Sequence, residues 1–350
     1  MRNINPTPRH LAVDPVASRK IDALGFVCAC LVVAIHTKGE DGGFVVDFIK
    51  HFANIAVPFF FTVSGYFIAR HFNDQGCWLR ESRKRVRTIL VPYLIWCLLT
   101  ALAVLPLSLM CDMIQGKKFG ASVSTTALNL FGFDFRSTPQ ANQLWYLRCL
   151  MVFVLMLPLF RFICRSRRML GVALFLVWMI SGGIVWWGEA LHSGLRGFLM
   201  WGASTEGLFY CLTGMAIGSG LLQMKSLPHA YSFILLGFGL AVLLAEVLGM
   251  DGHQFPFSLK SVYVPPILVS VWNLWPDMRL PAWTSHLSFP IYVMHVIFTS
   301  YTGAIARFLD IKGAVIFLVQ WVICIALTIV VTCSIRRLFP SFSGWVFGGR

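Results

Sequence analysis

The chain has 350 residues, of which 57% are hydrophobic and 13% are charged, and its mean hydropathy is +0.72. Soluble globular proteins carry about one quarter charged residues. The composition therefore excludes a soluble globular domain and predicts a polytopic membrane protein.

The net charge of +14 would also suit a nucleic-acid-binding protein, but the distribution of the basic residues argues against this. With the amino terminus placed inside, the first tail and the even-numbered loops hold 19 Lys and Arg residues and the other side holds 9, while Arg148 inside a span completes the 29. Cytoplasmic loops are enriched in Lys and Arg. The asymmetry thus predicts that both termini are cytoplasmic.

Segments of about 17–25 apolar residues are needed to cross a bilayer, and they must be helical because lipid offers the backbone no hydrogen-bond partners. Ten candidate spans follow in chain order: Ile21–Thr37, Phe52–Ala69, Thr88–Met110, Gln143–Phe160, Met169–Trp187, Phe198–Leu222, Tyr231–Leu248, Ser261–Trp275, Leu287–Phe308 and Ala314–Ile335. The sequence predicts an all-α integral membrane bundle of ten transmembrane helices at residues 21–337, between cytoplasmic tails at 1–20 and 338–350.

The first predicted span carries a histidine at its far end. At the helical period, Asp22, Gly25, Val32 and His36 fall on one face. Polar side chains inside a membrane cost free energy unless they have partners or a function. His36 is therefore either a satisfied interfacial residue or a functional group.

The second span and the loop after it hold the next polar features. Pro58 and Gly65 predict a kink and a close contact with another helix. Ser64 could line a cavity or only help the helices to pack. The basic loop either anchors the protein to anionic headgroups or binds phosphate through guanidinium groups. Its arginines include Arg80, Arg83, Arg85 and Arg87.

Ionisable residues in later spans should face the bundle interior and pair with one another. Arg148 and Glu206 could form an ion pair or act directly on a substrate. Ser288, Tyr292 and His295 share one face of the ninth span and could line one cavity. His295 could equally be a packed, hydrogen-bonded core histidine.

Five segments, in this order along the chain, resemble the signatures of the membrane-bound acyltransferase family 3. The first is Asp22–His36, with the spacing D-x-L-x7-V-x3-H, and the second is AVPFFFTVSGYF at Ala56–Phe67. The third is the basic loop followed by Pro-Tyr-x-x-Trp, at Arg80–Trp96. The last two are LWYL at Leu144–Leu147, which is similar to LWFL in the family, and SFPIYVMH at Ser288–His295. Cys28 stands in the place of an alanine in the first of these signatures, and a further departure removes a charge. The family usually has Arg or Lys eleven residues before the histidine, where this chain has Gly25. Lys20, Arg148 or a loop arginine could substitute for it.

The resemblance implies a multi-pass O-acetyltransferase of the bacterial inner membrane. Such an enzyme moves an acetyl group from acetyl-CoA to a sugar hydroxyl of a cell-surface polysaccharide or its lipid-linked precursor. His36 would remove the hydroxyl proton or carry an acyl-histidine intermediate, and Arg148 or Tyr292 would stabilise the oxyanion. The implied residues are His36, Arg148, Tyr292 and His295 for catalysis, Arg80, Arg83, Arg85 and Arg87 for acetyl-CoA, and Asp22, Ser64, Trp145 and Glu206 for the acceptor. Neither a metal ion nor a nucleic acid is expected; the expected partners are the glycan acceptor and membrane lipids.

Two alternatives stay open. The buried polar groups could line the pathway of a sugar or lipid transporter or flippase, although the paired repeats of many transporters are not visible in the sequence. The chain could also be a non-catalytic family member that acts in an assembly, because Gly25 replaces a basic residue. Consumption of coenzyme A thioester would separate the first alternative from the enzyme, and stabilisation by coenzyme A would argue against the second.

Overall fold

The computed structural model describes residues 14–38, 42–70, 83–114, 130–132, 141–187, 193–222, 227–249, 258–278, 280–281 and 283–348. These residues form helices and short connections. No strand occurs among them, which confirms the predicted all-α class.

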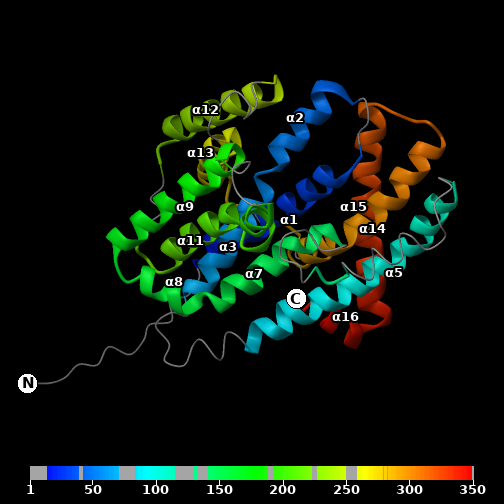
Figure 1. Ribbon diagram of the computed structural model, residues 1–350, viewed down its shortest axis with the longest axis horizontal. Helices are drawn as coiled ribbons and strands as arrows, with labels where there is room; N and C mark the ends of the chain where they lie inside the picture. Colours follow the sequence, from blue (N-terminus) through cyan, green and yellow to red (C-terminus); the bar gives the residue numbers. More distant parts are fainter. Residues whose placement is uncertain are drawn as a thin grey trace, which may run out of the picture.

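Helices run through the whole described chain. The first half forms α1 (Pro15–His36), α2 (Gly43–Ala53), α3 (Ala56–Ala69), η1 (Val86–Leu90), α5 (Val91–Ile114), η2 (Asn142–Leu144), α7 (Trp145–Leu155) and α8 (Leu157–Ile163). The second half forms α9 (Arg167–Trp187), α10 (Ser193–Gly197), η3 (Phe198–Gly202), α11 (Thr205–Gly218), α12 (His229–Val247), α13 (Leu259–Leu274), η4 (Thr284–His286), α14 (Ser288–Phe308), α15 (Ala314–Leu338) and α16 (Pro340–Val346). Figure 1 shows α1 near the middle of the molecule, where α2, α3 and α14 contact it.

Five helical stretches in the described chain are long and apolar enough to cross a membrane. They are Gly43–Ala69, Arg83–Ile114, His229–Val247, Ser288–Phe308 and Ala314–Leu338. A sixth is added if α7 and α8, bent by 67° against each other, form one broken span. The membrane character is thus supported, while ten spans with cytoplasmic termini stay a prediction.

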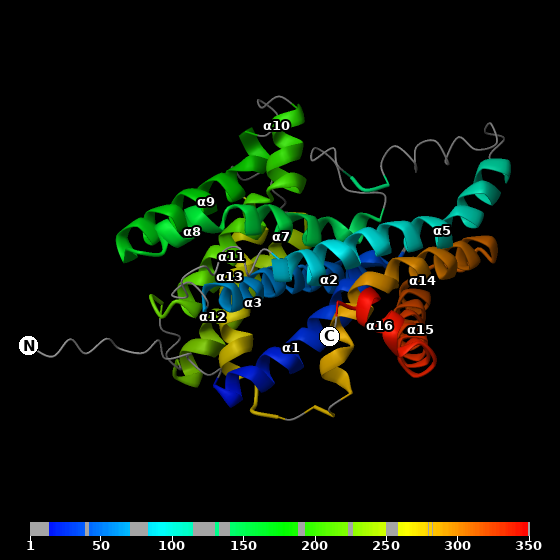
Figure 2. The same ribbon diagram turned by 90° about the horizontal axis from the view of Figure 1, so that it is seen from below.

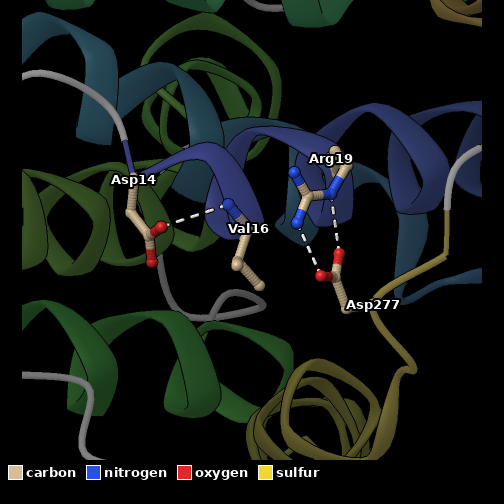
Figure 3. Close-up of polar contacts among 4 residues, drawn as sticks. All are labelled: Asp14, Val16, Arg19 and Asp277. Atoms are coloured by element: carbon tan, nitrogen blue, oxygen red, sulfur yellow. Dashed lines mark hydrogen bonds and ion pairs between the residues drawn. The ribbon is translucent and has the colours of Figure 1, made fainter.

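The first helix is fixed firmly at its amino-terminal end. Asp14 caps α1 by accepting a hydrogen bond of 3.1 Å from the Val16 amide (Figure 3). One turn further on, the Arg19 guanidinium forms a bidentate pair with Asp277, with hydrogen bonds of 2.7 and 2.5 Å. The hydrogen bond to Asp277 raises the pKa of Arg19. This pair connects α1 to the segment that precedes α14.

Glycines allow α3 and α11 to pack with their backbones close together. A Cβ atom added at Gly65 would overlap the carbonyl group of Cys211, and one added at Gly214 would overlap the carbonyl group of Thr62. Small residues permit such close approach in membrane helices. The predicted close contact of Gly65 with another helix is therefore confirmed.

The second and sixth predicted spans are each interrupted, because a new helix begins within them. The second divides after Ala53, and Pro58 lies in the first turn of α3, where a missing amide hydrogen is tolerated. The interruption at Asn54 and Ile55 lies within one turn before Pro58, which cannot donate to the Asn54 carbonyl, and this agrees with the predicted kink. In the sixth span the Ser204 hydroxyl caps α11 by accepting from the Gly207 amide at 3.1 Å, which separates α11 from η3.

The carboxy-terminal segment includes a short helix that packs back on the bundle. Figure 2 shows α16 beside α5 and α15. The Trp96 indole donates a hydrogen bond of 2.9 Å to the Val346 carbonyl, and its ring stacks on Phe347 with centroids 6.2 Å apart. The predicted tail from residue 338 onward is thus attached to α5 over part of its length.

Candidate functional site

His36 is the last residue of α1 and lines a cavity of about 580 Å³, here named the His36 cavity. Small-ligand sites commonly have volumes of about 300–1,000 Å³. The polar side chains around the cavity include Asn54, Gln143, Ser204, Glu206, Lys260 and Ser261. Because His36 lines this space rather than only packing inside the bundle, its imidazole can meet a ligand there.

His36 also lies against His295 of α14. The two ring centroids are 5.0 Å apart and the ring planes are inclined by 47°. His295 is fully buried, and its Nδ1 lies 3.0 Å from the Ile291 carbonyl oxygen. A carbonyl only accepts, so in a neutral ring Nδ1 carries the proton and Nε2 keeps its lone pair. The His295 ring thus packs against the His36 ring and limits the orientations open to that imidazole.

An ion pair and two indole rings lie at the same cavity. Lys260 Nζ is 3.0 Å from Glu206 Oε1 and donates a hydrogen bond of 3.1 Å to Oε2. The rings of Trp145 and Trp201 meet edge to face with centroids 5.7 Å apart. The cavity thus offers paired charges together with apolar aromatic surfaces.

A second cavity, of about 200 Å³, lies beside Gly25 and is here named the Gly25 cavity. Its polar side chains include Asp22, Ser64, Arg85, His286 and Ser288. A Cβ atom added at Gly25 would meet Ser288 Oγ at 3.6 Å, an ordinary contact distance, and Gly25 itself lines the cavity, so a side chain at this position would point toward that space. Arg85 from the start of η1 brings a positive charge to this cavity.

The two cavities follow one another along the same face of α1. Asp22 and Gly25 line the Gly25 cavity, and Val32 and His36 line the His36 cavity. The eleven residues from Gly25 to His36 correspond to a rise of about 16 Å. The face predicted from the sequence is thus the face that both cavities share.

Tyr146 of α7 and Tyr292 of α14 line both cavities, and this pair is here named the tyrosine wall. The rings meet edge to face with centroids 5.7 Å apart. The Tyr292 hydroxyl donates to the Gln143 carbonyl. The Tyr146 hydroxyl lies 2.9 Å from Ser64 Oγ and donates to the Phe60 carbonyl at 3.2 Å. Of the described residues that line either cavity, these two therefore border both.

Arg148 has a different environment from the one predicted. Its side chain is buried and donates to the Gly132 carbonyl, and to the Trp201 carbonyl at 3.1 Å. It is not among the residues that line either cavity. The predicted Arg148–Glu206 ion pair is wrong, because Glu206 pairs with Lys260. A catalytic role of Arg148 stays a prediction, and its backbone hydrogen bonds favour a structural one.

The predicted phosphate-binding arginines do not share one environment. Arg85 is half-buried and lines the Gly25 cavity, whereas Arg83 and Arg87 are exposed. Arg80 lies outside the described residues. Lys20, another candidate substitute for a cation at position 25, donates to the Trp272 carbonyl at 3.1 Å.

The other predicted site residues divide between the two cavities. Trp145 and Glu206 line the His36 cavity, Asp22 and Ser64 line the Gly25 cavity, and Tyr292 lines both. Among the described residues, no group of three or more His, Cys, Asp or Glu side chains could hold a metal ion.

Sequence reasoning missed several residues of the site, among them Tyr146, Trp201 and Lys260. Lys260 falls in the predicted loop between the seventh and eighth spans, and no local pattern indicates that it reaches Glu206 on another helix. Tyr146 could have been found from LWYL, since it is the position at which this segment differs from LWFL.

The chain belongs to acyltransferase family 3, whose model, described as an acyltransferase domain, matches residues 18–337. Its long apolar helices agree with the membrane character that the composition predicts. It is also similar to a protein of Enterococcus gallinarum named serine/alanine racemase, with 24% identity over 338 residues. That alignment covers 91% of this chain and 46% of the relative, so the chain spans about half the relative's length. No solved structure matches the chain.

Proposed function

We propose that the protein is an O-acetyltransferase of the bacterial inner membrane. It transfers an acetyl group from acetyl-CoA to a sugar hydroxyl of a cell-surface polysaccharide or its lipid-linked precursor. The observation that carries the proposal is the presence of two cavities on one face of α1, one with His36 and the other with Arg85, which meet at the tyrosine wall. A donor and an acceptor can thus approach each other from opposite ends of the same helix.

The donor is assigned to the Gly25 cavity. The family usually has a basic residue at position 25, and Arg85 brings a guanidinium group to the cavity in which such a side chain would lie. Guanidinium groups bind phosphates through charge-assisted hydrogen bonds. Arg85 therefore contacts the phosphate or pantetheine end of acetyl-CoA, and the thioester points toward the tyrosine wall.

The acceptor is assigned to the His36 cavity. Indole rings offer apolar faces to the C–H surface of a sugar, and carboxylate and ammonium groups exchange hydrogen bonds with hydroxyls. Trp145, Trp201 and the Glu206–Lys260 pair provide both. The acceptor hydroxyl lies against His36.

In the proposed reaction His36 acts as the general base. Neutral His36 accepts the hydroxyl proton while the oxygen attacks the thioester carbonyl carbon. The tetrahedral oxyanion collapses, the C–S bond breaks, and the coenzyme A thiolate takes the proton from the imidazolium. An acyl-histidine route would instead show ping-pong kinetics.

The proposed function is tested by supplying radiolabelled acetyl-CoA to membranes with and without the chain, and by mass spectrometry of the surface glycans. We expect the radiolabel to appear as an ester on the glycan only in membranes that contain the protein. Unchanged glycans and no consumption of acetyl-CoA would contradict the proposal.

Arg85→Ala is expected to weaken donor binding. Hydrogen bonds to charged groups contribute about 1.5–3 kcal/mol, so the KM for acetyl-CoA should rise about tenfold or more while kcat changes little. Arg83→Ala is the matched control, because Arg83 is exposed near the same helix start. Initial rates over a range of acetyl-CoA concentrations measure both constants. Equal KM values for the two variants would remove Arg85 from the donor site.

Transport of a sugar or lipid is a second candidate function, because two cavities separated by a thin wall would also suit alternating access. Movement of a glycan precursor across proteoliposomes without coenzyme A consumption would favour it over acetyl transfer.

A further inference from the structure

The hydroxyl of Tyr146 lies at the meeting point of the two cavities. Tyr146 is 9% exposed and lines both of them. Its ring is held by Phe61 at a centroid distance of 4.6 Å, by Tyr292 at 5.7 Å and by Phe60 at 6.2 Å. These contacts fix the ring, so its hydroxyl is presented in one position.

The hydrogen bonds of the two wall tyrosines differ. Tyr292 donates to the Gln143 carbonyl, which ties its proton to the backbone of η2. Tyr146 lies 2.9 Å from Ser64 Oγ, on the Gly25 cavity side, and donates to the Phe60 carbonyl at 3.2 Å. A serine hydroxyl can donate to the phenol oxygen while the phenol proton turns to another acceptor. Tyr146 can thus donate to a ligand in the wall without leaving Ser64.

We propose that the Tyr146 hydroxyl donates a hydrogen bond to the thioester carbonyl oxygen of the donor and stabilises the oxyanion that forms there. This inference rests on the proposed function. The Phe60 carbonyl is the resting acceptor of the phenol proton, and the thioester oxygen replaces it when the donor arrives. Ser64 donates to the phenol oxygen and polarises it, since hydrogen bonds in a chain strengthen one another. No proton is transferred in this step, so Tyr146 stays neutral.

Stabilisation of the oxyanion requires a hydrogen-bond donor that Arg148 and position 25 do not provide. An oxyanion requires a positioned donor close to the acyl carbon. Arg148 uses its guanidinium on the carbonyls of Gly132 and Trp201, and Gly25 provides no side chain. A phenol that lines both the donor and the acceptor cavity is in the right place to act instead.

Tyr146→Phe tests the inference, because it removes one oxygen and keeps the ring. Loss of one oxyanion donor should lower kcat about 10²–10³-fold, with the KM for acetyl-CoA and acceptor nearly unchanged. Tyr301→Phe is the matched control. It removes a hydroxyl that donates a hydrogen bond of 2.6 Å to the Ala103 carbonyl and lines neither cavity, so this variant should retain activity. Thermal unfolding in detergent verifies that each variant is folded.

A rescue variant separates an electrostatic role from a packing role. A side chain at position 25 has room in the same cavity, so Gly25→Arg added to Tyr146→Phe should restore at least part of the lost kcat. Tyr146→Phe with full kcat would overturn the inference alone. An active Gly25→Arg single variant that gives no rescue would also count against it. A wild-type protein without acetyl transfer would overturn the proposed function and the role of Tyr146 together.

Discussion

His36→Ala is expected to lower acetyl transfer by about 10²–10⁴-fold, the range that a positioned general base contributes. His36 lines the acceptor cavity and contacts His295, and no other histidine of the described chain lines that cavity. Rates of label transfer from acetyl-CoA to the glycan in membranes measure the effect.

His51→Ala is the matched control for His36→Ala. The His51 ring bonds to the Asp47 carbonyl within its own helix and does not line either cavity. This variant should keep normal transfer at normal protein levels. Retained glycan acetylation in a folded His36→Ala protein would reject His36 as the base.

Gly214→Ala is expected to have the largest effect on folding. Its Cβ would overlap the Thr62 carbonyl of α3, and backbone atoms in a packed helix pair cannot move aside cheaply. Overpacking usually costs about 1–3 kcal/mol, and an overlap with backbone should reach the upper end or prevent folding. The midpoint of thermal unfolding in detergent, or the yield of folded protein, measures this.

Gly237→Ala is the matched control for Gly214→Ala, because Gly237 also lies in a helix. An added Cβ at this position of α12 meets nothing within 4 Å. Alanine is favoured over glycine in helices by about 0.8–1.0 kcal/mol, so this variant should be as stable as wild type or slightly more so. If both substitutions left stability unchanged, α3 and α11 would not pack as closely as described.

The sequence predicted the class and the organising face of α1 because both depend on local regularities. Apolar length indicates membrane helices, and the helical period places Gly25 and His36 on one face. The glycine at position 65 likewise indicated a close helix contact. These features need no knowledge of which helices become neighbours.

The parts that could not be predicted depend on contacts between distant helices. Glu206 finds Lys260 rather than Arg148 because the neighbours of α11 are set by packing. Similarly, only the fold brings Tyr146 of α7 against Tyr292 of α14. Among the arginines of the basic loop, the fold also decides that Arg85 faces a cavity while Arg83 and Arg87 face outward. Local spacing carries no information on these choices.

The central proposal is that donor and acceptor reach one reaction point from opposite ends of α1, which we propose face opposite sides of the membrane. Sealed inverted vesicles, with the cytoplasmic face outward and the glycan acceptor enclosed, test it directly. Radiolabelled acetyl-CoA added outside should label the enclosed glycan while the vesicles stay intact and coenzyme A appears outside. Labelling that occurs only after detergent opens the vesicles, so that both substrates share one side, would contradict the account.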